Sequence, residues 1–333
     1  MIIPNGPCDP PHPPMTVRAG RPGRLVFAGE AIVDVLMRVP GLPERGGDLL
    51  ATSAEVAVGG GFNVMAAAAR QGLPVLYAGG HGTGPWGDLV RAALTAEGIG
   101  LLRSPDPSRD TGFDVALVEP DAERTFVTSL GAESVGDPGS WDAVPAEPGD
   151  AVYVSGYGLV APGTGAALGT WAAALPADVL LFVDPGPLVA QVPAAVLDPV
   201  LARCDWLSCN HREAALLSGA GAADAPGDPA EAARRLLARG AAANVLVRAG
   251  GAGCYLALLA SSGVVHVRAP KVTAVDTTGA GDAHSGAFLA ALAGGVPPLG
   301  AAARANAAAA FAVTRPGPAT SPTNAQLDAW LGG

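Results

Sequence analysis

Residues 272–288 read VTAVDTTGAGDAHSGAF, and this stretch decides how the chain is interpreted. Asp276 and Asp282 flank a Gly-rich turn at 278–281, and an Ala-rich segment of helical character follows. Small residues let backbone N–H groups converge on an anion, and the start of a helix adds a favourable dipole. A carboxylate beside a turn that only bound phosphate would repel the anion. Asp282 fits better as a base that takes a hydroxyl proton while the turn holds a migrating phosphoryl group, which favours a kinase.

The structural alternative is a Gly-rich turn that caps a core helix, with Asp282 complementing the helix dipole. A bare Gly-Ala-Gly-Asp would favour that alternative. The stretch, however, closely resembles the C-terminal signature of the ribokinase/PfkB carbohydrate kinase family, roughly D-T-x-G-A-G-D. The resemblance implies that Asp282 is the catalytic base and that Gly279, Ala280 and Gly281 form the anion hole. It also implies an α/β fold, a ribokinase-like three-layer αβα sandwich with a central, mostly parallel sheet and a small β-sheet lid.

The composition of the chain excludes several classes of partner and location. The chain has 333 residues, 49% of them apolar and 15% charged, with a formal net charge of −10. An acidic chain with scattered basic residues argues against a nucleic-acid partner, because phosphate backbones need clustered Lys and Arg. The four cysteines have no paired spacing, which indicates reduced thiols and a cytoplasmic protein. No apolar stretch is long enough for a membrane span.

The chain is expected to be organised as an extension followed by one kinase domain. Residues 1–23 hold a proline cluster and predict a disordered extension, and residues 24–331 form the domain. Strands at 31–39 and 49–58 and a hairpin at 113–118 and 124–128 lack helices between them. They therefore predict a separate small sheet, the lid, drawn from about 31–58 and 111–130. Later segments alternate strand and helix, which predicts a parallel sheet covered by helices.

A second Gly-rich turn precedes an Ala-rich helix at 64–71, and a lone Asp34 follows the first strand. The turn resembles the family's N-terminal signature. The resemblance implies that the acceptor sugar is held by Asp34, Gly59, Gly60, Asn63, Glu123 and Asp282. Taken alone, the Gly run is more typical of a tight turn and Asp34 of an exposed strand end, and the C-terminal signature reverses that preference. Gly60 stands where ribokinases often have Lys, and Val58 where a Gly is common, so ribose specificity is not implied.

The prediction of the residues that bind ATP and metal ions depends on weaker sequence patterns. Asn210 and Glu213 match the family's N-x-x-E motif, which implies that they organise Mg²⁺ and its waters near ATP. The resemblance further implies nucleotide contacts from Asn210, Arg248, Gly250, Gly253, Thr277 and Asn306. It also implies a monovalent cation, K⁺, held by Asp276, Thr278, Ala312, Arg315, Gly317 and Ser321, mostly through carbonyls. His284 is expected to lie on a helix surface.

These patterns together predict an ATP-dependent kinase for a small sugar of the ribose, fructose or 2-keto-3-deoxygluconate type. A nucleoside kinase of the same fold remains open, with Phe62, Phe113 and Phe126 as candidates to stack on a base. A sensor that binds nucleotide or sugar without turnover is the alternative from another class. A Rossmann dehydrogenase would need G-x-G-x-x-G after the first strand, which is lacking. Some relatives dimerise by clasping lids, and exposed apolar lid strands would allow a homodimer here.

Overall fold

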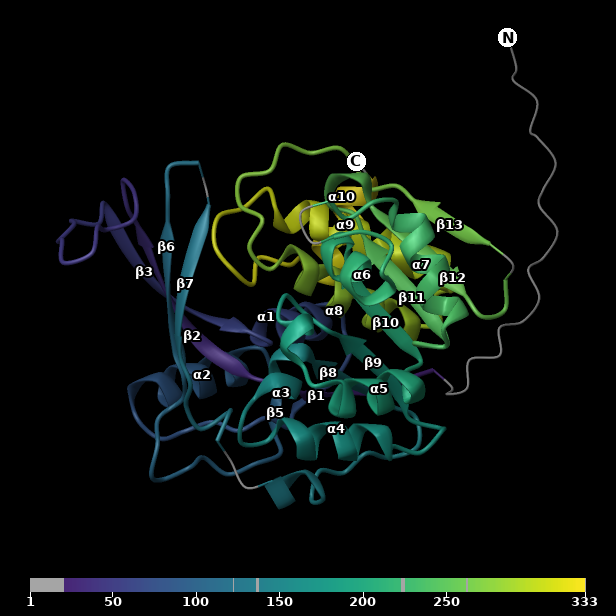
Figure 1. The fold of residues 1–333 in the computed structure, drawn as a ribbon, viewed down its shortest axis with the longest axis horizontal. Coiled ribbons are helices and arrows are strands. Elements are labelled where there is room, and N and C mark those ends of the chain that lie inside the picture. The colour runs from purple at the N-terminus through teal and green to yellow at the C-terminus, as the bar shows by residue number, and fades with distance from the viewer. Residues whose placement is uncertain (1–20, 122, 136–137, 223–224, 262, 333) are drawn as a thin grey trace, which may run out of the picture.

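In the computed structural model, which describes residues 21–332 except 122, 136, 137, 223, 224 and 262, nine strands form one sheet. Their order is β13-β12-β11-β10-β9-β8-β1-β4-β5 (Figure 1). Neighbouring strands pair in parallel, except that β12 runs antiparallel to both of its neighbours, β11 and β13. The sheet comprises β1 (Arg24–Ala28), β4 (Val75–Tyr77), β5 (Gly100–Leu101), β8 (Asp150–Ser155), β9 (Leu180–Asp184), β10 (Trp206–Asn210), β11 (Asn244–Arg248), β12 (Cys254–Leu258) and β13 (Val264–Val267).

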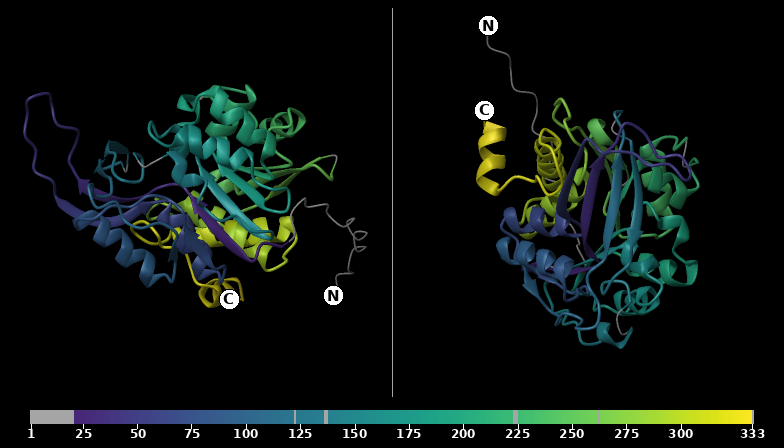
Figure 2. Two further views of the ribbon diagram at one scale, coloured as in Figure 1. Left: turned by 90° about the horizontal axis from the view of Figure 1, so that it is seen from below. Right: turned by 90° about the vertical axis from the view of Figure 1, so that its left-hand side faces the viewer.

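Helices cover both faces of this sheet because its central strands are apolar on both sides. Every residue of β8 and β9 is buried, as expected for parallel strands inside a sandwich. The helices are α1 (Phe62–Arg70), α2 (Pro85–Ala96), α3 (Gly156–Val160), α4 (Gly165–Ala173), α5 (Ala194–Arg203), α6 (His211–Ser218), α7 (Pro229–Ala238), α8 (Ala280–Ala293), α9 (Pro298–Ala312) and α10 (Asn324–Gly332). One apolar cluster joins the sheet to α1, α2, α8, α9 and α10, and a second joins its other face to α3–α7 (Figure 2).

A four-stranded sheet, the lid, stands beside this sandwich, at the left of Figure 1. Its order is β3-β2-β6-β7, with β2 and β6 parallel and the outer pairs antiparallel. The strands are β2 (Ala31–Arg38), β3 (Ser53–Gly60), β6 (Phe113–Val118) and β7 (Arg124–Ser129). The predicted three-layer α/β fold with a mostly parallel sheet and a separate small sheet is thereby confirmed.

The strand register defines two lid faces. Asp34, Asp114 and Thr128 lie in one row, two residues from the row of Leu36, Ala116 and Phe126, so they share a face. Arg124 also belongs to this face, and it is ion-paired with Asp276 of the sandwich across 2.6 Å. We call it the inner face. The outer face carries the row Val56, Val35, Val115 and Val127.

The structure describes only the last residues of the predicted N-terminal extension. Residues 1–20 of the predicted extension lie outside the described residues, whereas the Gly23 N–H donates to the Gly149 carbonyl at 2.8 Å. The extension and the domain limits therefore stay a prediction. In the described part of the chain, no helix is both long and apolar enough to cross a membrane.

Candidate active site

The start of α8 forms the centre of the candidate site. Gly279 precedes the helix in the left-handed region, with φ of 70°, a conformation that glycine adopts without strain. The first turn of a helix has N–H groups without intrahelical acceptors, and Gly281 and Asp282 lie in that turn. The predicted anion-hole residues thus occupy a place where backbone donors and the helix dipole favour an anion.

Asn63 connects the two glycine-rich signatures. Its side-chain amide donates to Asp282 Oδ2 at 3.1 Å, although the two residues are 219 positions apart. Asn63 is buried in the first turn of α1, where the Gly-rich turn delivers it. This bond fixes the orientation of the Asp282 carboxylate at the beginning of α8.

Asp34 lies against the same glycine-rich turn from the inner face of the lid. A Cβ at Gly59 would stand 2.0 Å from Asp34 Oδ2, so only glycine fits beside this carboxylate. Gly60 adopts a positive φ of 59° at the junction of β3 and α1. The glycines of the signature therefore have two physical roles here, space for Asp34 and a left-handed turn. Asp34, Asn63 and Asp282 are brought together as predicted.

Two further carboxylates belong to this group and were missed from the sequence. Asp114 pairs in register with Asp34, is only 8% exposed, and has no hydrogen-bond partner at Oδ1 among the described residues. Glu30 accepts a hydrogen bond from the Ser155 hydroxyl at 2.7 Å. The signal for Asp114 was an acidic residue at a buried position of the otherwise apolar strand FDVALV.

Burial raises the pKa of these groups. Burial, with the neighbouring Asp114 and Asp282 charges, raises the pKa of Asp34 to about 7. Burial alone raises the pKa of Asp114 to about 6. The pKa of Asp282 is raised to about 6 by burial and by Asp184, while Asn63 and Arg248 act in the opposite direction. Perturbed carboxylates gathered around one helix start are typical of an active site.

Glu123 lies apart from this group. It sits exposed in the turn between β6 and β7, where its N–H donates to Asp121 Oδ1 at 3.0 Å. At about 3.3 Å per residue, the strand puts it about 16 Å from the Asp114 row. Its neighbour Arg124, rather than Glu123, reaches the sandwich.

On the nucleotide side, Asn210 and Glu213 form the capping box of α6, in which each residue's side chain bonds the other's backbone N–H. The Arg248 guanidinium donates to Asp184 Oδ2 and the Ser208 hydroxyl, each at 2.7 Å, and lies 3.8 Å from Glu213. It also passes close to Gly281, because a Cβ there would be 3.5 Å from Arg248 Nε. Arg248 thus packs against the first turn of α8 from the side of the central sheet.

The remaining residues predicted to contact the nucleotide are Gly250, Gly253, Thr277 and Asn306. Gly253 has a positive φ of 99°, and a Cβ there would be 2.1 Å from the Val267 carbonyl. Gly250 begins the short 3-10 turn Gly250–Ala252, and Thr277 is exposed just before the anion-hole turn. The buried Asn306 amide donates to the Val267 carbonyl at 2.8 Å, so it ties α9 to β13.

The expectation of a surface His284 is wrong. His284 is buried, because α8 packs against α1, α9 and the sheet. Burial and the nearby Arg248 charge lower its pKa to about 3, so the imidazole is neutral. Among the described residues, no group of three or more His, Cys, Asp or Glu is placed to hold a metal ion.

Comparison with known proteins identifies the class. Residues 23–325 match the model of the pfkB family of carbohydrate kinases. The chain therefore belongs to the pfkB family, and it is an ATP-dependent carbohydrate kinase.

Individual relatives agree with this assignment. The chain is 32% identical to the uncharacterized sugar kinase YegV of Escherichia coli (strain K12), covering 91% of this chain and 92% of that protein. It is 30% identical to a fructokinase of Klebsiella pneumoniae, over 83% and 86% of the two chains. Arabidopsis thaliana ribokinase, solved with ribose and ATP, has the same fold, with a TM-score of 0.75, 23% identity, and coverage of 93% and 99%.

Proposed function

We propose that this protein transfers the γ-phosphoryl group of ATP to a hydroxyl of a small, uncharged sugar. The observation that carries the proposal is the Asp282 carboxylate at the start of α8, oriented by Asn63 and faced by Asp34 from the lid. A base, an anion-binding helix start and a polyol-binding carboxylate are the parts that phosphoryl transfer to an alcohol requires.

In this mechanism Asp34 and Asn63 orient the acceptor, and Asp282 accepts the proton of the attacking hydroxyl. An alcohol is a far weaker acid than a carboxylic acid, so the proton moves late, as the new bond to phosphorus forms. Backbone N–H groups of Gly279, Ala280 and Gly281 stabilise charge on the transferring group, and the Ala280 N–H also donates to the Thr277 carbonyl at 3.2 Å. Arg248, held by Asp184 and Ser208, donates to the Ser285 hydroxyl of α8 at 3.1 Å and so keeps the helix start in place.

The oxygen donors near Arg248 fit a hydrated Mg²⁺ that arrives with the nucleotide. Asn210, Glu213 and Asp184 offer the oxygen ligands that Mg²⁺ prefers, yet each is also engaged within the protein. These residues would hold the ion through water, and the ion would supply positive charge that neutralises the phosphates. Arg248, Gly250, Gly253, Thr277 and Asn306 stay proposed nucleotide contacts, with the Asn306 amide already used by Val267.

The charge of the acceptor side supports a neutral substrate. Glu30, Asp34, Asp114 and Asp282 are carboxylates that influence one another's ionisation. The carboxylate of 2-keto-3-deoxygluconate would be repelled there, whereas hydroxyls of ribose or fructose would donate to these oxygens. We therefore favour an uncharged acceptor of the ribose or fructose type over a sugar acid of the 2-keto-3-deoxygluconate type.

A nucleoside acceptor has one feature in its favour. Phe62 is buried and Phe113 packs against Trp86, with ring centroids 5.7 Å apart. Phe126, by contrast, is 55% exposed on the inner face of the lid, where a base could stack on it.

The decisive experiment measures ADP release with Mg²⁺-ATP across ribose, fructose, 2-keto-3-deoxygluconate, adenosine and other nucleosides. The Asp282→Asn variant should keep the fold, checked by circular dichroism, and lose about 10³-fold or more in kcat on the accepted substrate. The exposed Asp142→Asn is the matched control. Near-normal turnover by Asp282→Asn would rule out the mechanism. ATP binding without acceptor-dependent ADP release would point to the sensor.

A further inference from the structure

The loop that follows α9 does not fit the monovalent cation that the family resemblance implies. The Asp276 carboxylate is already saturated: Oδ1 accepts from Arg124 Nη2 at 2.6 Å, from the Thr278 hydroxyl at 2.7 Å and from the Thr278 N–H at 2.9 Å. Oδ2 accepts from the Gly317 N–H at 3.1 Å. The negative charge that would attract the cation is thus paired with a guanidinium.

Two of the carbonyl oxygens expected to complete the cation site, those of Ala312 and Ser321, are engaged as well. The Ala312 carbonyl accepts from the Thr320 hydroxyl and from the Arg315 N–H, each at 3.1 Å. The Ser321 carbonyl accepts from Arg70 Nη1 at 3.1 Å, and its hydroxyl lies 3.5 Å from the same nitrogen. The Arg315 side chain turns away and stacks on Phe311, 3.4 Å from the ring centre.

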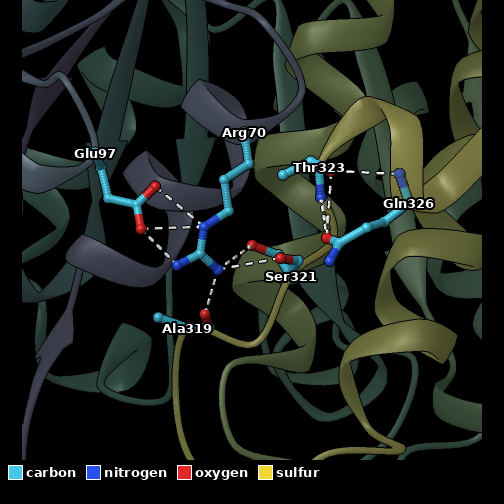
Figure 3. Close-up of polar contacts among 6 residues, drawn as sticks. All are labelled: Arg70, Glu97, Ala319, Ser321, Thr323 and Gln326. Carbon is cyan, nitrogen blue, oxygen red and sulfur yellow. Dashed lines mark hydrogen bonds and ion pairs between the residues drawn. The ribbon is translucent and has the colours of Figure 1, made fainter.

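Arg70, at the end of α1, holds the other side of this loop. Figure 3 shows its guanidinium between the Glu97 carboxylate and the loop oxygens of Ala319 and Ser321. The ion pair with Glu97 measures 2.5 Å, and both side chains are largely buried. A cation brought to Asp276 would have to compete with the Arg124 guanidinium for the same carboxylate oxygen.

Both arginines connect to the anion-hole turn through a residue that each of them binds. Ala319, whose carbonyl Arg70 binds, has a positive φ of 50°, a strained conformation for a residue with a Cβ. Its N–H lies 3.7 Å from the place of a Cβ on Gly279. On the other side, Asp276 forms the turn with Thr278 that leads into Gly279. Arg124 belongs to β7, so its contact also joins the lid to this turn.

We propose that the guanidinium groups of Arg124 and Arg70 replace a monovalent cation beside the anion hole, so that catalysis by this chain does not require K⁺. The inference rests on the proposed function only for its kinetic test. Arg124 and Arg70 are positioning residues in this scheme: they hold the Asp276 turn and the Ala319 loop against Gly279.

The first test needs no substrate. Melting temperatures are compared in KCl and in tetramethylammonium chloride at equal ionic strength. The wild-type protein should melt within about 1 °C in the two salts, because no specific K⁺ site adds stability. Arg124→Ala exposes the Asp276 carboxylate and should gain a K⁺-specific increase in melting temperature. A K⁺-specific stabilisation of the wild type would overturn the proposal, whatever the acceptor is.

The second test is kinetic and uses the acceptor found in the ADP-release panel. Wild-type kcat should change less than about 2-fold between the two salts, and Arg124→Ala should lose about 10-fold, partly restored by K⁺ alone. Arg124→Lys should retain most of the activity, because it keeps the charge. Arg38→Ala, an exposed arginine in the same row of the lid, should behave as wild type. A loss in Arg124→Ala that K⁺ does not relieve would contradict the proposal.

Discussion

At the scale of residues, a cluster of carboxyl groups governs how this site responds to pH. Asp282, Asp34 and Asp114 are all raised in pKa, chiefly by burial, and they lie close enough to influence one another. In such a cluster, a titration reports on the group rather than on one residue. Rate and stability should therefore depend on pH in opposite directions.

The rate should require the ionised cluster. The pKa of Asp282 is raised to about 6, and as the proposed base it can accept a proton only when it is deprotonated. We expect kcat/KM to rise about tenfold per pH unit below pH 6 and to level off above about pH 7. The measurement is kcat/KM between pH 5 and 9 with a saturating Mg²⁺-ATP concentration. A profile that stays flat down to pH 5 would contradict the assignment of Asp282.

Stability should show the reverse trend. The pKa of Asp34 is raised to about 7, so the folded state binds this proton more tightly than the unfolded state does. The stability that results is complete below about pH 4 and is lost as pH rises through about 7. Asp34→Asn removes the charge, and we expect its melting temperature at pH 8 to exceed that of the wild type by about 2 °C or more. The gain should be smaller at pH 5. The exposed Asp142→Asn should show no such pH-dependent difference.

The sequence pointed to some of these residues and not to others. Asp282, Asn63 and Asp34 stand beside glycine-rich turns whose pattern is visible along the chain. Asp114 and Glu30 carry no such marker, because their place in the site depends on how β6 pairs with β2 and how Ser155 approaches β1. The register between distant strands is a tertiary property that local patterns do not contain.

Among the elements, the contact between α1 and α8 positions the site. Gly286 of α8 faces α1 so closely that a Cβ there would be 2.5 Å from the Val64 carbonyl. We expect Gly286→Ala to destabilise the fold by about 1–3 kcal/mol through overpacking and to disturb the Asn63–Asp282 bond. Gly294, which follows α8, has room for a Cβ at 3.5 Å, so Gly294→Ala should be neutral or slightly stabilising. Urea unfolding of both variants measures the difference. Equal effects would contradict this account.

Strand and helix segments were largely predictable, and the exceptions have local causes. The helix α5 was missed because Pro199 lies in its interior, where proline removes a backbone donor. His284 was expected at the surface because a histidine in an Ala-rich helix is usually solvated. The helix α8 is instead buried on nearly all sides, which apolar residues around its whole circumference would have indicated.

For the molecule as a whole, the lid is the cover for the acceptor in the proposed function, and it also exposes an apolar surface. The valine row of the outer face crosses all four strands, and Val127 on the edge strand β7 is 66% exposed. An apolar row on a sheet with open edges favours contact with a second copy of the same sheet. This supports the proposed homodimer through the lid.

That proposal has a direct test. Val127→Glu places a charge at the exposed edge-strand end of the valine row, and burying an unpaired charge in an interface is strongly unfavourable. We expect sedimentation velocity to show a dimer for the wild type and a monomer for Val127→Glu. Leu259→Glu is the matched control, because Leu259 is 65% exposed and lies outside the lid. It should remain a dimer.

A wild-type monomer at micromolar concentration would refute the lid dimer. A dimer that persists in Val127→Glu would place the interface elsewhere. Because Arg124 extends from the same strand to Asp276, loss of the dimer should also loosen the lid and raise KM for the acceptor more than it lowers kcat.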